Sequence, residues 1–480
     1  MPNNNSQEQI IYRSLAGKIQ LGFFDGGARF PSVQKVAGQY GVSYCPAQRA
    51  LKAMERDGLI SLCRGRETQV LAKPYGDFLA SPVFRERAPA LSDLTRALML
   101  ISPEIGLQGM SRVKDAPAWA EAGGAPGKRL YDLFWRSLRA LGSRTALSLY
   151  YDVGSFAESA FLDILRLSQG EDGRFPEALY ADMLRSWEAC RGGRYATARQ
   201  RMDQAGRRFT GEVEAYLDGL PAAAEGTGEA FTWEPHKGRT RYCDVVAIDI
   251  ICRINQGEYP VGALLPNVAE VADTYHISVI TLRRTIAVLN KLGVTRSING
   301  VGTRVISAGD ASILGKMEEL MLDENLRSFL EALQLLTMTC EAVLRQAFPH
   351  FTGEVLEELD RAVAAPGENA SMVAVLTVCL QAAIRCSPAA AIREIYGKLT
   401  LQLLKGSVLR LSETGEEPVP GWPDYARALR EALAAGDGAR FARTVRLLSE
   451  ENFLATKRTL LELGVSGAAE VADPLGIELE

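Results

Sequence analysis

The stretch "YGVSYCPAQRAL", Tyr40 to Leu51, returns later in the chain as "YHISVITLRRTI", Tyr275 to Ile286. The two stretches are 235 residues apart, and this separation holds without a gap from about residue 10 to residue 70. Chance does not keep one register for so long, so the sequence predicts a tandem duplication. The matching pairs include Gly22 with Gly257, Pro31 with Pro266, Gly58 with Gly293 and Val70 with Val305.

Each copy begins with apolar residues at a spacing of four, which predicts an amphipathic helix. These are Ile11, Leu15 and Ile19 in the first copy and Val246, Ile250 and Ile254 in the second. A glycine-rich turn and a short helix follow, and then comes the stretch quoted above.

A serine begins the third predicted helix of each copy. We expect the hydroxyls of Ser43 and Ser278 to cap this helix by accepting a backbone N–H. Pro46 falls in the first turn, where proline costs little. Beyond Gly58 and Gly293, short β-branched stretches predict a two-stranded wing with a glycine tip. A helix, a helix-turn-helix and a β-wing form a DNA-docking unit whose serine-capped helix enters the major groove.

Composition limits the other possibilities. The 480 residues suffice for three or four domains, and a hydrophobic share of 47% is ordinary for globular proteins. We find no apolar run of about 18 residues and no leader sequence, so we expect a cytoplasmic protein without a membrane segment. The eight cysteines are scattered and are expected to be reduced thiols. Three histidines, His236, His276 and His350, are too few for two metal sites, so we expect neither metal nor cofactor.

Charge is distributed unevenly along the chain, whose net charge is −4. Residues 7–75 contain ten Lys and Arg against five Asp and Glu, and residues 240–306 contain seven against five. The remainder is therefore acidic. Two basic modules on acidic bodies suit local contact with phosphate while the rest of the protein is repelled from DNA.

The repeated segments resemble the winged helix-turn-helix of GntR-type transcriptional regulators. The matching stretches are "IQLG", "GARFPSVQKVA", "GVSYCPAQRAL" and "GRETQV", and then "INQG", "GALLPNVAEVA", "HISVITLRRTI" and "GVGTRV". The resemblance implies a mainly α fold in which two winged helix-turn-helix heads, each with a small β-wing, alternate with two all-helical bundle domains. The expected boundaries are 7–75 and 240–307 for the heads, 90–220 and 315–465 for the helical bodies, and 221–239 for a linker.

The departures from the family pattern fall on the residues that would read DNA. The arginine after the serine is replaced by Tyr44 and Val279, and Thr-Val-Arg becomes Pro46-Ala47-Gln48 in the first copy but Thr281-Leu282-Arg283 in the second. Each missing arginine removes contacts of about 1–3 kcal/mol. The expected DNA contacts are Ser32, Gln34, Lys35, Ser43, Tyr44, Gln48, Arg49, Arg64 and Arg66 in the first head, and Asn267, Ser278, Thr281, Arg283, Arg284, Arg296, Asn299 and Thr303 in the second.

Alternative roles remain open for some of these residues. Arg49 and Arg284 fit a salt bridge within the head as well as a DNA contact. Tyr44 fits either stacking on a sugar or covering the turn.

The bodies are expected to be helical throughout. "ALREALAAGDGARFARTVRLL" is similar to the closing helices of the FadR-type effector domain of GntR regulators. In that family an aspartate and three histidines often hold a metal, but Trp135 and Thr377 occupy the central histidine position here. An effector pocket between helices is expected without metal. Arg136, Arg139, Arg385 and Arg393 either line it or belong to solvated faces.

The resemblance implies a regulator whose partners are double-stranded DNA and a small-molecule effector. One chain would supply both heads as an intramolecular pseudo-dimer, and a homodimer of two such chains is also allowed. The alternative is a degenerate regulator that acts as a sensor or protein-interaction module with weak or no specific DNA binding. An enzyme is not expected, because the helical bodies lack the α/β domain and Schiff-base lysine of pyridoxal-phosphate relatives.

Overall fold

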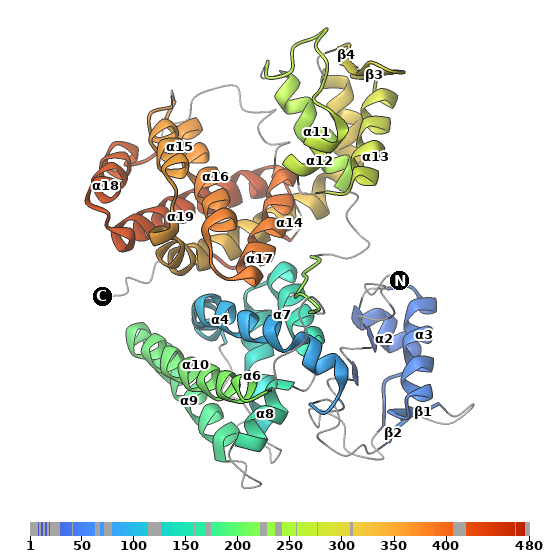
Figure 1. Cartoon of the computed structure of the whole chain (residues 1–480), viewed down its shortest axis with the longest axis vertical. Helices are drawn as coiled ribbons and strands as arrows, with labels where there is room; N and C mark the ends of the chain where they lie inside the picture. Colours follow the sequence, from blue (N-terminus) through green and yellow to red (C-terminus); the bar gives the residue numbers. More distant parts are fainter. Residues whose placement is uncertain are drawn as a thin grey trace.

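The computed structural model describes residues 8, 11–12, 15–16, 19, 29–40, 42–62, 68–71, 79–113, 126–157, 160–168, 174–220, 228–235, 242–255, 257–275, 277–307, 311–365, 367–406, 419–465 and 467–475. Two heads alternate with two helical bodies along the chain, and both heads lie on the right-hand side of the view in Figure 1. This is the mainly α architecture that the repeat predicted. Among the described residues, no helix is long and apolar enough to cross a membrane.

Each head contains a helix-turn-helix followed by a two-stranded antiparallel wing. Head 1 contains α2 (Val33–Tyr40), α3 (Tyr44–Arg56), β1 (Ile60–Ser61) and β2 (Gln69–Val70). Head 2 contains α11 (Tyr242–Asn255), α12 (Val268–Thr274), α13 (Val279–Lys291), β3 (Thr295–Ile298) and β4 (Gly302–Val305). The leading apolar residues of both copies are buried, among them Ile11, Leu15, Val246 and Ile250. The i, i+4 spacing therefore identified the core face of the first helix in each head.

The bodies are helical wherever they are described. Body 1 contains α4 (Pro82–Met110), α6 (Pro126–Ala140), α7 (Arg144–Ala157), α8 (Ala160–Ser168), α9 (Arg174–Arg191) and α10 (Tyr195–Asp218). Body 2 contains α14 (Ala311–Ala347), a 3-10 turn at Phe348–His350, α15 (Gly353–Val363), α16 (Glu368–Cys386), α17 (Ala390–Leu403), α18 (Trp422–Ala435), α19 (Gly438–Glu462) and a 3-10 turn at Ala468–Glu470.

The two bodies share one hydrophobic core. A single buried cluster contains Leu94 and Leu149 of body 1 together with Leu335 and Ile392 of body 2. The first long helices, α4 and α14, pack against each other, and each also packs on the other body: α4 on α17, and α14 on α7. The first long helices α4 and α14 correspond, and the similar sequences of residues 133–147 and 375–392 match α7 to α17, so the contacts are reciprocal, as in a twofold interface.

Carboxylates repeat this reciprocity at helix N-termini, where backbone N–H groups lack partners within their own helix. Asp93 of α4 accepts from the backbone N–H groups of Ala390 and Ala391 at the start of α17, at 3.0 and 2.7 Å. Glu331 of α14 accepts from the Thr145 N–H at the start of α7, at 2.8 Å, and from the Thr145 hydroxyl at 2.9 Å. Each body therefore caps a helix of the other with a negative charge at the favourable end of the helix dipole.

The segment that precedes head 2 is anchored between the bodies over residues 228–235. The Trp233 side chain is fully buried, its indole N–H donates to Ser148 of body 1, and its backbone N–H donates to Glu394 of body 2. Glu229 pairs with the buried Arg87 at 2.7 Å. This part of the predicted 221–239 linker is therefore packed against both bodies, because two large aromatic residues, Phe231 and Trp233, lie among its small residues.

The described C-terminal segment is laid against body 1. Gln108 and Leu475 exchange two hydrogen bonds of 2.7 and 3.2 Å between the Gln108 amide and the Leu475 backbone. Gln334 of α14 donates to the carbonyls of both Leu141 and Ala472. Between α6 and α7, Gly142 has a φ of +66°, and a Cβ there would lie 1.8 Å from the Glu470 carbonyl oxygen. The chain end thus locks body 2 onto a turn of body 1 that only glycine can form.

Candidate nucleic-acid interface

The second helix of the helix-turn-helix is exposed at its start in both heads. In head 2, α13 begins after Ser278, whose hydroxyl accepts the Thr281 N–H at 3.1 Å and lies 2.8 Å from the Thr281 hydroxyl. Because Leu282 and Leu289 are buried in the core of the head, the opposite face of the helix is turned toward solvent. This is the side-chain cap that the sequence predicted for Ser278.

The cap predicted for Ser43 is wrong in its side-chain part. Ser43 precedes α3 with the extended backbone of an N-cap residue, but its hydroxyl makes no capping hydrogen bond. The third residue of α3 is Pro46, where α13 has Thr281, and proline has no backbone N–H to donate. Pro46 is buried and lacks the N–H that corresponds to the one Ser278 accepts from Thr281.

The expected reading residues differ in exposure between the heads. In head 2, Arg283 and Arg284 are exposed, and neither forms an ion pair with another described residue. In head 1, Tyr44 is 49% exposed, Gln48 is half-buried, and the exposed Arg49 pairs with Glu8 at 2.8 Å. Arg49 therefore makes the salt bridge within the head that was one of its two interpretations, and Arg284 makes none among the described residues.

The first helix of each helix-turn-helix presents its N-terminus to solvent. Ser32, Gln34 and Lys35 are exposed, and the Ser32 hydroxyl lies 3.4 Å from the Lys35 backbone nitrogen, which donates to it. In head 2, Asn267 and Glu270 form a capping box, in which the Asn267 side chain accepts from the backbone N–H groups of Ala269 and Glu270 at 2.9 and 3.0 Å. Asn267 therefore has a defined structural role in addition to the expected DNA contact.

The wing of head 2 carries two arginines, of which only Arg296 was predicted from the sequence to contact DNA. Arg296 of β3 lies directly opposite Arg304 of β4, and both are exposed without an ion pair to another described residue. Like charges directly across an antiparallel pair destabilise it, so the pair indicates a place for an external anion. Arg304 was not predicted as a DNA contact. In "GVGTRV" it lies next to the core residue Val305, and because side chains alternate along a strand, this position faces outward.

The other expected wing residues have different outcomes. Asn299 is exposed at the tip of the wing. Thr303 is buried, its hydroxyl lies 3.4 Å from that of Ser297, and its carbonyl accepts the Leu265 N–H. Thr303 therefore packs the wing against the head and does not present its side chain to a ligand. Arg64 and Arg66, the expected wing contacts of head 1, lie outside the described residues.

Tyr40 and Tyr275 occupy equivalent positions in the two heads but make different contacts. In head 2, Tyr275 donates to the buried Asp249 at 2.7 Å, and Arg253 pairs with the same carboxylate at 2.8 Å. Burial, together with the adjacent Asp249 carboxylate, raises the pKa of Tyr275. This network braces the helix-turn-helix from within. In head 1 the matching Tyr40 instead lies against Tyr151 of body 1, with ring centroids 6.2 Å apart.

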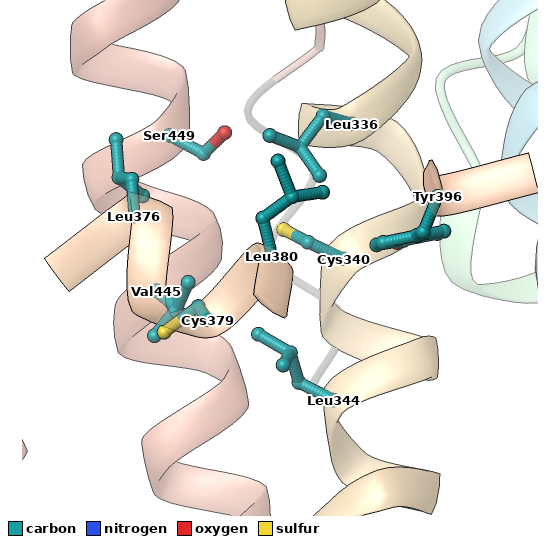
Figure 2. A pocket seen from close by; sticks show the side chains of 9 residues that line it. All are labelled: Leu336, Cys340, Leu344, Leu376, Cys379, Leu380, Tyr396, Val445 and Ser449. Atoms are coloured by element: carbon teal, nitrogen blue, oxygen red, sulfur yellow. The ribbon is translucent and has the colours of Figure 1, made fainter. Parts of the chain in front are cut away.

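Body 2 contains an apolar pocket between α14, α16, α17 and α19. Figure 2 shows the nine side chains that line it: Leu336, Cys340, Leu344, Leu376, Cys379, Leu380, Tyr396, Val445 and Ser449. None of them is charged. The hydroxyls are already partnered, Tyr396 with Thr339 at 3.0 Å and Ser449 with Thr337 at 2.9 Å. Burial raises the pKa of Cys340 to about 12, which keeps this thiol neutral.

The arginines considered for an effector pocket lie elsewhere. Arg385 pairs with Glu358, and Arg393 donates to the Ser387 carbonyl at 2.6 Å. Arg136 and Arg139 are exposed. Within the described part of the chain, no group of three or more His, Cys, Asp and Glu side chains is placed to hold a metal ion. His236 and His276 lie outside that part, and His350 is exposed at the end of its 3-10 turn.

A comparison with protein families matches the chain twice to "Bacterial regulatory proteins, gntR family", over residues 7–70 and 244–305. These ranges coincide with the two heads. A search of curated proteins returns no match.

Solved structures resemble the chain only weakly. A GntR protein of Streptococcus agalactiae is 16% identical, with 44% of this chain and 99% of that one covered and a TM-score of 0.23. A GntR family member from Pseudomonas syringae pv. tomato is 12% identical over 46% and 87% of the two chains, with a TM-score of 0.25. McbR/YncC of E. coli is 14% identical over 46% and 98%, with a TM-score of 0.23. Scores this low place no constraint on how the domains of this chain are arranged.

The two family matches fall on segments that the structure folds as a helix-turn-helix with a wing, each with an exposed second helix. Residues 7–70 and 244–305 therefore each form a gntR-family domain of bacterial regulatory proteins, and the chain carries this domain twice in tandem.

Proposed function

We propose that the chain is a transcriptional regulator in which a single molecule supplies both DNA-binding heads as an intramolecular pseudo-dimer. The observation that carries this proposal is the reciprocal capping across the two bodies, in which Asp93 caps α17 and Glu331 caps α7. A regulator that dimerises through its bodies would bury such an interface between two chains. Here one chain has both halves, so no second copy is needed to bring two heads together.

The unlike recognition helices favour unlike half-sites. Glutamine is suited to adenine and arginine to guanine in the major groove, so Gln48 and Arg283 at equivalent positions are expected to select different bases. If the heads sit symmetrically, the half-sites lie about one helical turn apart or a multiple of it. The operator would then be asymmetric in sequence although the protein is nearly symmetric in fold.

Selection of DNA from a random pool by the full chain tests this proposal. We expect two unlike half-sites, and we expect Gln48→Ala to relax one of them and Arg283→Ala the other. The two variants are matched controls for each other, since they occupy equivalent positions in the two heads. Recovery of symmetric palindromes would reject the unlike half-sites.

Salt dependence distinguishes the main alternative, a degenerate protein that senses or binds other proteins without specific DNA binding. The ion pair of Arg49 with Glu8 favours this alternative for head 1, because it reduces the charge available to phosphate. Affinity for mixed genomic fragments should fall steeply between 50 and 200 mM salt if phosphates are contacted. A flat response would support the degenerate protein.

We further propose that body 2 responds to an uncharged, largely apolar small molecule that would widen the pocket of Figure 2, a cavity of about 10 Å³ with room for about one water molecule. Its walls are leucine, valine and neutral thiol groups, and its hydroxyls are already hydrogen-bonded, so a carboxylate would find no partner there. Such a ligand would alter DNA affinity by binding the two states of the bodies unequally. The proposed role places the protein in the cytoplasm, where the chromosome is accessible.

A thermal-shift screen of the full chain with uncharged apolar molecules and matched carboxylates tests the pocket. We expect shifts with the uncharged molecules only. Cys379→Leu fills the pocket with a larger side chain and should abolish the shift, whereas Cys190→Leu in body 1 should not. A shift produced by the carboxylates alone would contradict the assignment.

A further inference from the structure

Two β-branched apolar side chains are exposed at the start of the recognition helix of head 2. Ile280 is 63% exposed and Val279 is 39% exposed, on the first turn of α13. The core of head 2 makes no use of them, since it is built from other residues of that helix, among them Leu282 and Leu289. The fold does not require apolar residues at these positions either, because Tyr44 and Cys45 occupy them in head 1.

Unpaired cations surround this apolar spot. Arg283 and Arg284 follow on the same helix, and Arg296 and Arg304 stand opposite each other on the wing that packs beside it. All four are exposed, and none forms an ion pair with another described residue. A protein partner that covered the spot would have to supply a carboxylate for each of the four arginines or bury them unpaired, which is costly. A polyanion that also presents apolar groups suits both features at once.

Duplex DNA presents such groups only in the major groove, where the C5-methyl of thymine is the apolar feature of the base edges. Val279 and Arg283 are four residues apart, and Ile280 and Arg283 are three apart, so they share one face of the helix. An arginine directed at guanine O6 and N7 would therefore sit one turn away from apolar groups directed at the neighbouring base.

We propose that head 2 recognises thymine through its methyl group, with Val279 and Ile280 packing against it beside the guanine read by Arg283. This inference rests on the proposed DNA-binding function and adds the chemistry of one half-site. Head 1, with Tyr44 and Cys45 at the equivalent positions, has no comparable apolar pair and should not depend on thymine methyls in this way.

Deoxyuridine tests the proposal, because it removes the methyl group and keeps the hydrogen-bonding edge of thymine. Each thymine of the operator selected by the full chain is replaced singly, and the head 2 half-site is identified as the one that Arg283→Ala relaxes. We expect one or two replacements in that half-site to weaken binding about fourfold each, which corresponds to the roughly 0.8 kcal/mol of one buried methyl group. Replacements in the head 1 half-site should leave affinity unchanged.

Val279→Ser and Ile280→Ser complete a double-mutant cycle with the modified DNA. Because both side chains are exposed, the variants should unfold at the temperature of the parent protein. We expect Ile280→Ser to weaken binding to thymine-containing DNA and to lose sensitivity to the deoxyuridine replacement, whereas the matched Cys45→Ser in head 1 should retain full sensitivity.

The outcomes separate this inference from the function on which it rests. Failure to select any DNA, or binding that does not depend on salt, would overturn both. Specific binding that is insensitive to every deoxyuridine replacement would overturn the thymine contact alone. An Ile280→Ser variant that binds more weakly but keeps its sensitivity would likewise assign the methyl contact to other residues.

Discussion

At the scale of single residues, the third position of the recognition helix separates the two heads. Thr281 donates its N–H to Ser278, and Pro46 has no N–H to give to Ser43. The consequence is a capped helix in head 2 and an N-cap serine in head 1 whose hydroxyl is not used for capping. A hydroxyl that is not used for capping at a helix N-terminus is well placed for phosphate, so we propose Ser43 as a phosphate contact.

We expect Ser278→Ala to destabilise the start of α13 by about 1 kcal/mol, since it removes a capping bond. In the full chain this appears as roughly fivefold faster hydrogen exchange of the first amides of α13. Ser43→Ala is the matched control and should leave exchange in α3 unchanged. Equal acceleration in both helices would contradict the structural difference between the caps.

Arginines of head 2 should divide into two classes by their effect on binding. We expect Arg283→Ala to cost about 1–3 kcal/mol on the selected operator and to relax the choice of one base pair. Arg296→Ala should weaken binding to all sequences alike and lower the slope of log affinity against log salt by about one. Affinity measured at several salt concentrations on specific and scrambled DNA distinguishes the two classes.

Much of this residue-level detail could be read from the sequence, and some of it was overlooked there. Pro46 at the third helical position already removes the N–H that Thr281 donates in head 2. The period of two in a strand places Thr303 on the same face as the core residue Val305, which is why it is buried. The sequence left open whether Arg49 forms a salt bridge, because its pairing with Glu8 depends on how two helices pack.

At the scale of elements, the capping of one body's helix by the other body's carboxylate is the central feature. Glu331 is fully buried and also forms ion pairs with Arg327 at 3.0 Å and Arg144 at 3.5 Å. Asp93 is half-buried and, among the described residues, accepts hydrogen bonds from backbone amides alone. The two caps act on corresponding helices and differ in environment.

We expect Glu331→Ala to destabilise the chain by about 3–5 kcal/mol, since it leaves buried cationic and amide groups without their acceptor. Asp93→Ala should cost about 1 kcal/mol, as for the loss of an exposed cap. Urea unfolding followed by tryptophan fluorescence, to which the buried Trp233 contributes, and by circular dichroism checks both values. A larger loss for Asp93→Ala would contradict this ranking.

Helix periodicity predicted the bodies as helical but did not predict how they pack. Residues 331–340 of α14 are all buried, because this helix lies between elements of both bodies. The same run contains Glu331, Gln334, Thr337 and Thr339, and each of these side chains makes at least one hydrogen bond in the fold. From the sequence alone these polar residues indicate a solvated face, so complete burial of the helix could not be foreseen.

At the scale of the whole molecule, the constant separation of the repeat predicted two heads, and the looser repeat of the bodies left their arrangement open. The structure joins the bodies through one core, a buried tryptophan segment and the C-terminal segment. A chain organised in this way should bind its operator as one molecule.

Sedimentation of the protein with a fluorescent operator duplex should therefore give a complex of one chain per duplex. The binding isotherm should follow a single hyperbola without a concentration threshold, because no assembly step precedes binding. A complex of two chains, or a steep sigmoidal isotherm, would show that a homodimer is the active form.

The shared core of the two bodies has a further consequence for gene dosage. When a regulator must dimerise from separate subunits, halving the subunit concentration more than halves the dimer concentration. Its occupancy of the operator therefore falls faster than its abundance. Here every translated chain already contains both heads and both bodies. Control by this protein would scale in direct proportion to its expression, which suits a cell that keeps only a few molecules of it.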